Sequence, residues 1–304
     1  MTPLLLIAAI MLLAFPGVAA PMGRRMPPGE WARIGRAAIV AGRVLLPVAL
    51  ALIALPTALD IAGLEHAAAS CRHLDGGVHG APFGVMAGLA LVASEIGVAR
   101  ARRRHRRVQE TVRVDPWLGV HADRGDHDLV VLPTADHVAY AVGGASPQVV
   151  LSQGLVDGLL DDEIAAVVGH EAAHVRHGHH RYLELAAVVD ALLLGTSVGR
   201  RSATALRTAV ERWADEVAAS SVPRRAVRGA LLKCSQRNVT FVASFSGEVP
   251  VLERLDALAG GPPERDWRSR VVIVAPIVAI CAAVMPMLAI VVADHGLLGR
   301  LACW

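Results

Sequence analysis

Residues 167–175 read VVGHEAAHV and place two histidines four positions apart in a stretch that is typical of a helix. Because residues four apart lie on one helical face, His170 and His174 can bind one metal ion together. Glu171 follows His170 directly, where its carboxylate can take a proton from a water molecule bound to that ion. The stretch therefore predicts a helix that carries two zinc ligands and a general base.

Two imidazoles leave a tetrahedral zinc without a third protein ligand, and a catalytic zinc also keeps one position open for water. Residues 211–215 read ERWAD in an alanine-rich stretch that is compatible with a helix. Glu211 and Asp215 are again four apart, so both can point into one site. We expect Glu211 to complete a site for one Zn²⁺ per chain. Asp215 is the candidate acceptor that holds a ligand imidazole in its zinc-binding tautomer.

A short motif of this kind also occurs on ordinary surface helices. The metal-site interpretation is favoured because the flanking residues define a complete helix over about 162–177. Acidic residues 161–163 suit its N-terminus, Ile164 and Val167 contribute an apolar side, and Gly178 can end it.

Apolar stretches dominate the rest of the chain, which has 304 residues, of which 54% are hydrophobic. Four of them, at 3–20, 37–59, 81–99 and 271–293, are close to the length of about 20 residues that crosses a bilayer as a helix. A cleaved signal peptide is the alternative for the first, but its arginines follow the apolar run instead of preceding it. The sequence predicts a mainly α, polytopic membrane protein with about four transmembrane helices. Its expected parts are three spans in 1–99, a soluble domain at 100–270, and the fourth span with a short tail at 271–304.

The arginines predict an orientation, because positive charge favours the cytoplasmic side. They concentrate between the first two spans, after the third and before the fourth, which places both termini outside and 100–270 in the cytoplasm. The run at 100–107 could bind nucleic acid, but its position directly after a span favours anionic lipids, and we expect no direct nucleic-acid binding. Lys233 is the only lysine, a bias that suggests a GC-rich bacterial genome and hence the bacterial inner membrane.

The soluble domain is expected to be α+β. Short β-branched runs at 128–132, 137–142 and 148–151 predict a small antiparallel sheet before the zinc helix. An edge strand of such a sheet can pair with an extended substrate backbone. Further helices are predicted at 182–194, 202–220, 225–237 and 248–258. The first of these is apolar nearly all round, which fits either a buried core helix or one lying on the membrane.

Histidines crowd the end of the zinc helix at His177, His179 and His180. They could form a second metal site, but we favour a solvated cap in which protonated imidazoles lie near a helix C-terminus. The expected topology also places Cys71 and Cys303 on the outer side, where a disulfide between them would persist.

Four stretches together resemble a known group of enzymes, the membrane-embedded gluzincins. They are YAVG at 140–143, VVLSQGL at 149–155, LDDEIAAVVGHEAAH at 160–174 and ERWAD at 211–215, within about a quarter of the chain. Two branches compete: the BlaR/MecR-type antirepressor metallopeptidases, and the CAAX-prenyl and heat-shock-induced membrane proteases. A zinc domain between the third and fourth of four spans resembles the BlaR/MecR type. The penicillin-binding domain of that family's antibiotic sensors has no counterpart in residues 294–304, so antibiotic sensing is not supported.

The resemblance implies a zincin-like domain that hydrolyses peptide bonds of a protein substrate, with a transcriptional repressor in regulatory proteolysis as the candidate substrate. It implies zinc on His170, His174 and Glu211, with Glu171 as the base, as the residues themselves suggest. The donor that stabilises the reaction's oxyanion is left open among Tyr140, His137 and nearby arginines. Quality-control or CAAX-type processing, a non-proteolytic zinc-binding regulator and a metal transporter are the alternative functions. Retention of Glu171 argues against the regulator, and the motif's place outside the spans argues against the transporter.

Overall fold

The computed structural model describes residues 2–74, 80–115, 118–236, 240–241 and 251–261, and the isolated positions 271, 275 and 278. Apart from those isolated positions, the predicted fourth span lies outside the described residues, as does Cys303. Both the fourth span and the Cys71–Cys303 disulfide therefore stay predictions.

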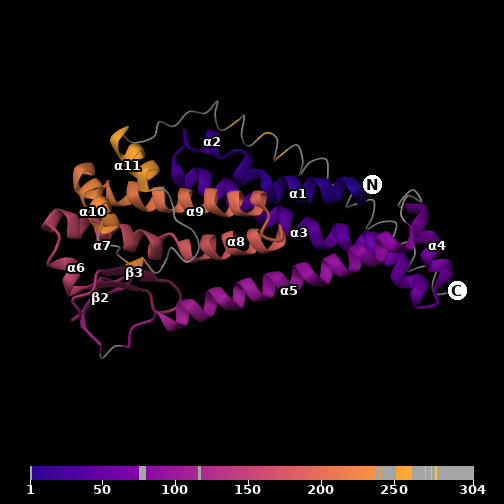
Figure 1. Cartoon of the computed structure of the whole chain (residues 1–304), viewed down its shortest axis with the longest axis horizontal. Coiled ribbons are helices and arrows are strands. Elements are labelled where there is room, and N and C mark those ends of the chain that lie inside the picture. Colours follow the sequence, from indigo (N-terminus) through magenta and orange to yellow (C-terminus); the bar gives the residue numbers. More distant parts are fainter. Residues whose placement is uncertain are drawn as a thin grey trace.

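Three long helices form the elongated half of the molecule (Figure 1). They are α1 (Thr2–Val18), α3 (Pro28–Ile61) and α5 (Ala81–Thr111). Short helices α2 (Ala20–Gly23) and α4 (Glu65–Leu74) lie in the connections between them. By length and composition, α3 and α5 can each cross a membrane, whereas α1 is a shorter apolar helix of 17 residues. The helices predicted at the first three apolar stretches are confirmed, and the four-span topology stays a prediction.

An apolar face of α5 is open to the surroundings of the protein. Phe83, Met86, Leu89 and Val92 are each more than half exposed, at helical spacing along the first half of the helix. A row of large exposed apolar side chains is unfavourable in water and is typical of a surface that faces lipid. The membrane interpretation of this half of α5 therefore rests on exposure as well as composition.

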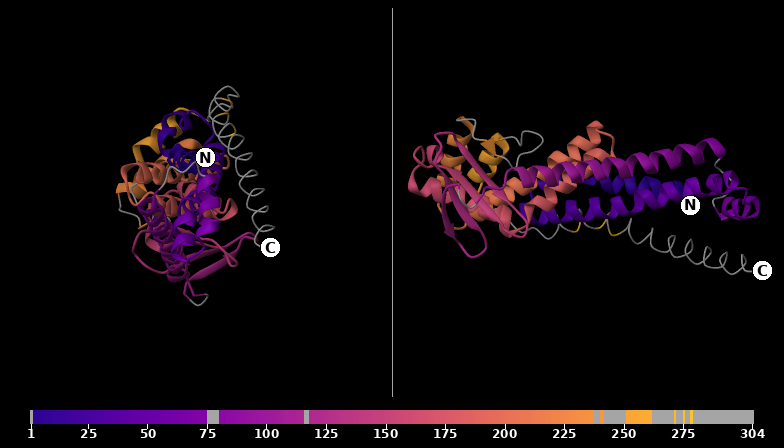
Figure 2. Two further views of the ribbon diagram at one scale, coloured as in Figure 1. Left: turned by 90° about the vertical axis from the view of Figure 1, so that its right-hand side faces the viewer. Right: turned by 90° about the horizontal axis from the view of Figure 1, so that it is seen from below.

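A five-stranded sheet lies at the other end of the molecule, away from α4 (Figure 2). Its strands are β1 (Val120–Asp123), β2 (Asp128–Leu132), β3 (Val138–Val142), β4 (Gln148–Ser152) and β5 (Thr240–Phe241), in the order β1-β2-β4-β3-β5. The three predicted strands are confirmed. The prediction of an antiparallel sheet is wrong, because β2 pairs parallel with β4 and β3 pairs parallel with β5.

The mixed pairing arises from the segment between β2 and β3, which passes over to the far side of β4 instead of forming a hairpin. Ser152, at the end of β4, fixes this crossing. Its hydroxyl donates to Asp136 O at 2.6 Å and accepts from Val138 N at 2.9 Å. The sequence between the strands reads as a turn, but it does not reveal which neighbour the next strand will pair with.

The zinc helix, α7 (Asp161–Arg176), packs on β3 and β4. The Glu163 carboxylate accepts from the backbone N–H of Leu160 at 2.8 Å, at the start of the helix. Lys233 of α10 (Arg224–Gln236) donates to the same carboxylate at 2.5 Å. These contacts, with the apolar cluster that includes Ala166 and Val167, fix α7 between the sheet and α10.

A helical hairpin joins the two halves of the molecule. It consists of α8 (His179–Leu192) and α9 (Ser197–Ala218), which pack on each other and on α3, while α8 also packs on α5 and α9 on α1. Ala186, Val188 and Val189 of α8 are fully buried in the cluster that contains the α1 and α3 residues. Of the two interpretations of this apolar helix, the structure supports the buried core helix.

Candidate metal centre

Three predicted ligands converge between α7 and α9. His170 Nε2 lies 3.1 Å from His174 Nε2 and 3.4 Å from Glu211 Oε2, and His174 Nε2 lies 3.6 Å from Glu211 Oε1. Ligands of a tetrahedral zinc with bonds of about 2.1 Å lie about 3.4 Å from each other. The donor set and its spacing therefore fit one Zn²⁺.

Helix packing explains this convergence. The two histidines lie one turn apart on α7, and Glu211 lies near the middle of the long helix α9, which packs against α7. The ligand side chains are between 5% and 11% exposed. Within the described ranges, these three residues make up the one group of three or more histidine, cysteine or carboxylate side chains close enough to share a metal ion.

Asp215 lies where the sequence predicts a supporting acceptor. Its Oδ1 is 3.0 Å from His170 Nδ1, on the side of the ring away from the other ligands. A proton on Nδ1 leaves the lone pair of Nε2 free to bind a metal. Burial alone would lower the pKa of His170, but contacts with Asp215 and Glu211 outweigh it and raise the pKa to about 10 in the metal-free site.

Arg254 belongs to the centre and was not predicted from the sequence. It lies on α11 (Val251–Ala259), and its Nε and Nη2 donate to the two carboxylate oxygens of Asp215 at 2.8 and 2.7 Å. Its Nη1 lies 3.2 Å from Glu211 Oε2. Burial would raise the pKa of Asp215, but Arg254 and His170 together lower it to about 2. Arg254 thus keeps both carboxylates ionised.

His179 also lies in the centre, although the sequence did not predict it there. The prediction of a solvated cap is wrong for it, because its side chain is fully buried. Its Nδ1 lies 3.0 Å from His174 Nδ1, so each of the two candidate ligand histidines has a partner on its Nδ1. The reason is the left-handed Gly178, with φ of +61°, which ends α7 and turns His179 back towards His174. Burial lowers the pKa of His179 to about 2, so the ring is neutral.

Glu171 lines a pocket together with His170 but is not part of the donor cluster. Its side chain is 1% exposed, and its Oε2 has no hydrogen-bond partner among the residues described. Burial raises its pKa to about 7, and Glu211 adds to the rise while His170 and Arg254 oppose it. A buried carboxylate with this pKa can accept and return a proton near neutrality.

A narrow pocket of about 20 Å³ adjoins Glu171 and Arg254. Its other wall is apolar and comes from α10, through Val227, Ala230 and Leu231. Tyr140, a candidate oxyanion donor, does not share this region. Tyr140 packs with Val130, Val142 and Val150. Its neighbour on the strand, Ala139, packs instead in the cluster that contains α7 residues. Tyr140 therefore lies on the sheet face away from the metal centre.

Comparison with known proteins agrees with this centre. Residues 99–260, more than half of the chain, match the model of peptidase family M48. A protease HtpX homolog of Methanopyrus kandleri is 40% identical over 91 residues, which is 28% of this chain and 28% of that protein. The chain thus aligns with little more than a quarter of the length of this relative. No solved structure matches. These comparisons give the membrane metalloprotease group and do not show the BlaR/MecR branch.

Proposed function

The chain belongs to peptidase family M48, and on that premise we propose that it is an integral membrane zinc endopeptidase that cleaves a protein substrate. The observation that carries the proposal is the position of Glu171. It is a buried carboxylate with an unpaired oxygen, directly beside a His170–His174–Glu211 donor set that fits zinc. A purely structural zinc site needs four protein ligands and no such base.

When bound, Zn²⁺ supplies a Lewis acid that polarises the scissile carbonyl and lowers the pKa of an attacking water to about 7. Glu171 accepts the proton of that water and passes it to the leaving amine. Asp215 and His179 hold the ligand imidazoles in the tautomer that presents Nε2. Arg254 is positively charged and forms ion pairs with the carboxylates of Asp215 and Glu211.

The substrate is proposed to be a protein at the cytoplasmic face of the bacterial inner membrane. The course of α5 supports this placement. Its exposed apolar face continues directly into the arginine run at 100–107, and the chain then enters the proposed catalytic domain. A repressor cut in regulatory proteolysis and a membrane protein cut in quality control both fit this placement. The family match supports quality-control proteolysis as much as regulatory proteolysis.

Comparison of protein termini in cells that carry the native chain or Glu171→Gln tests the proposal. We expect new termini that depend on Glu171 in proteins of the cytoplasm or inner leaflet. The identity of the cut proteins separates regulatory from quality-control proteolysis. If the two cell lines give the same termini, the chain is a non-proteolytic zinc protein. If the cuts fall in exported domains, the proposed orientation is wrong.

A further inference from the structure

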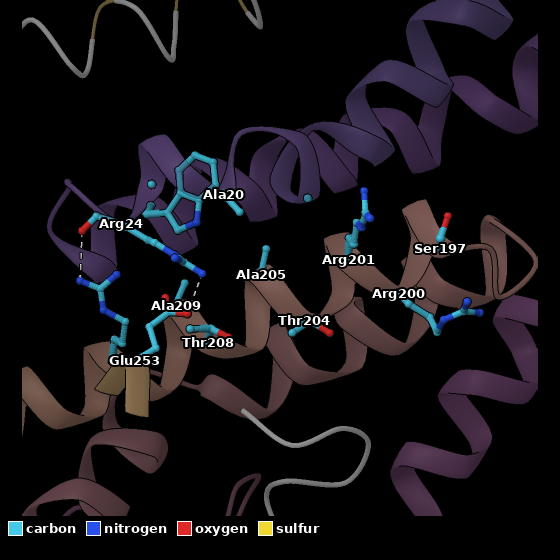
Figure 3. Close-up of a pocket in the computed structure, with 14 residues that line it drawn as sticks. Ala20, Arg24, Ser197, Arg200, Arg201, Thr204, Ala205, Thr208, Ala209 and Glu253 are labelled. Carbon is cyan, nitrogen blue, oxygen red and sulfur yellow. Dashed lines mark hydrogen bonds and ion pairs between the residues drawn. The ribbon is translucent and has the colours of Figure 1, made fainter. Parts of the chain in front are cut away.

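A cavity of about 380 Å³ lies between the end of α1, α2 and the outer side of α9, separate from the metal centre. Figure 3 shows Arg201 and Ala205 of α9 pointing towards the N-terminal helices, with Thr204 and Thr208 beside them on α9 and Ala20 and Arg24 on the opposite wall. One end of this cavity is fixed by Ser202, whose hydroxyl donates to Ala14 O at 3.1 Å and accepts from Gly17 N at 3.3 Å. The cavity is thus built by packing between distant parts of the chain.

Hydrogen-bond donors and positive charge dominate its polar lining. Arg24, Arg200, Arg201 and Arg212 line it against one carboxylate, Glu253. Arg24 Nη2 forms an ion pair with Glu253 Oε2 at 2.9 Å. Arg200 donates to Gly195 O, so the guanidinium groups of Arg201 and Arg212 remain, and Glu253 is the one carboxylate among the described residues that line the cavity. Like charges gathered in this way repel each other unless an anion lies between them.

Arg212 gives a second and independent observation. Its Nη2 donates to Arg24 O at 3.2 Å, but its Nε is buried with no hydrogen-bond partner in the described part of the chain. Buried polar groups in folded proteins nearly always have a partner, so the Arg212 guanidinium has hydrogen-bonding capacity that the described chain does not use. Guanidinium groups match the oxygen geometry of phosphate, which accepts from several donors at once.

The place of the cavity agrees with such a ligand. It lies where α1 ends at Val18 and the spanning helix α3 begins at Pro28, with Trp31 of α3 in its wall. This is the level at which lipid headgroups meet the proposed cytoplasmic side. We propose that the cavity binds a phosphate group, carried either by an anionic lipid headgroup or by a soluble phosphate compound, and that the bound group stabilises the metal centre.

The link to the metal centre lies in two pairs of adjacent residues. Arg212 follows the ligand Glu211 on α9, and Glu253 precedes Arg254 on α11. The two helices therefore each place one residue in the cavity and one in the centre. A phosphate that neutralises the arginines holds α9 and α11 together from the cavity side and keeps Arg254 on Asp215. The expected effect on zinc affinity can be measured without any peptidase activity. Only an expected effect on the peptidase rate rests on the proposed function.

The test uses the full chain in nanodiscs of phosphatidylcholine, with or without phosphatidylglycerol. One arm measures phosphatidylglycerol retained by the released protein in native mass spectrometry. The other arm titrates inorganic pyrophosphate into neutral nanodiscs by calorimetry. Both are run on the native chain, on Arg201→Gln and on the control Arg228→Gln, which changes another exposed arginine, on α10 and outside the cavity. Zinc affinity is measured in each state by chelator competition.

We expect the native chain to bind one of the two probes and Arg201→Gln to bind it about tenfold more weakly, with Arg228→Gln unchanged. Retention of phosphatidylglycerol alone identifies a lipid, and pyrophosphate binding alone identifies a soluble ligand. Zinc should bind more tightly when the cavity is filled. Binding of neither probe, or equal weakening by both variants, overturns the site. Binding without a change in zinc affinity overturns the link to the centre. None of these readouts needs proteolysis, so an inactive protein that binds phosphate refutes only the proposed function.

Discussion

The rings of His179 and His174 meet edge to face, with their Nδ1 atoms 3.0 Å apart and their planes at 86°. Only one of two facing nitrogens can carry the proton. When His174 binds a metal through Nε2, its Nδ1 holds the proton and donates it to His179. Because the pKa of His179 is lowered to about 2 by burial, its Nδ1 can serve as this acceptor near neutral pH.

His179→Phe is expected to weaken zinc binding by about 10–100-fold while leaving the fold intact, since it removes the acceptor but keeps an aromatic ring in the buried space. Chelator competition on the purified chain measures the affinity. His177→Phe is the control, because His177 stacks on Trp213 at 4.6 Å and not on a ligand. Equal affinities for both variants would show that His179 only fills space.

The contact between Arg254 and Asp215 predicts strong coupling between the two residues. Removing one member of a buried ion pair leaves an uncompensated charge and typically costs about 3–5 kcal/mol. Arg254→Gln should therefore lower both the free energy of unfolding and zinc affinity, and Asp215→Asn should lower zinc affinity about 10–100-fold. In the double variant the two costs should be clearly less than additive.

Chemical denaturation and metal competition on the three variants measure this coupling. Arg176→Gln is the control, because Arg176 pairs with Asp126 at the surface, where both side chains are more than a third exposed. It should change stability by less than about 1 kcal/mol. Additive effects of Arg254→Gln and Asp215→Asn would show that the two residues act separately.

A third set of variants should distinguish the metal ligands from the general base. His170→Ala and Glu211→Ala should lose both zinc and peptide hydrolysis, since each removes a donor from the cluster. Glu171→Gln should keep zinc and lose turnover, because the amide cannot accept the proton of water. Metal analysis beside a cleavage assay decides between these outcomes. A Glu211→Ala protein with native zinc content and rate would exclude Glu211 as a ligand.

The sequence could place the residues that share a helix with a motif. His170 and His174 on one turn, and Glu211 and Asp215 on another, follow from the helical period, and the structure brings all four together. The helices themselves could also be placed, because their apolar periodicity and end signals are local. The roles of these residues are what the variants above test.

Contacts between distant segments could not be predicted from these local signals. Arg254 lies 39 residues from Asp215 on a short helix without a motif, so nothing local identifies its partner. His179 was visible as one of several histidines, but its burial depends on how Gly178 turns the chain and on the packing of Trp213. The parallel pairing of β2 with β4 likewise depends on tertiary packing, since strand propensity is the same for either direction.

The orientation of the chain can be tested by cysteine labelling. Glu65→Cys on α4 and Arg228→Cys on α10 are both exposed positions at opposite ends of the molecule. In a background without the natural cysteines, a membrane-impermeant maleimide should label Glu65→Cys in intact cells and Arg228→Cys only after lysis. The reverse pattern would place the zinc centre outside and remove cytoplasmic proteins from the possible substrates.

Zinc binding should depend on pH through His170. In the metal-free protein its pKa is raised to about 10 by Asp215 and Glu211, against the opposing effect of burial, so the ring is protonated near neutral pH. His174 is neutral there, because burial lowers its pKa to about 4. Zinc therefore displaces one proton from Nε2 of His170, and its affinity should rise by at least about tenfold per pH unit between pH 6 and 8.

Calorimetric zinc titrations in two buffers of different ionisation enthalpy measure the number of protons released. Glu171 adds a fraction of a proton, since its pKa of about 7 in the metal-free site must fall when a dication binds next to it. Glu171→Gln should remove that fraction and keep the proton of His170. Asp215→Asn should instead reduce the pH dependence, because it removes the largest of the contacts that raise the pKa of His170, while burial and Arg254 still lower it. A proton count that is the same for Asp215→Asn and the native chain would show that Asp215 does not control the protonation of His170.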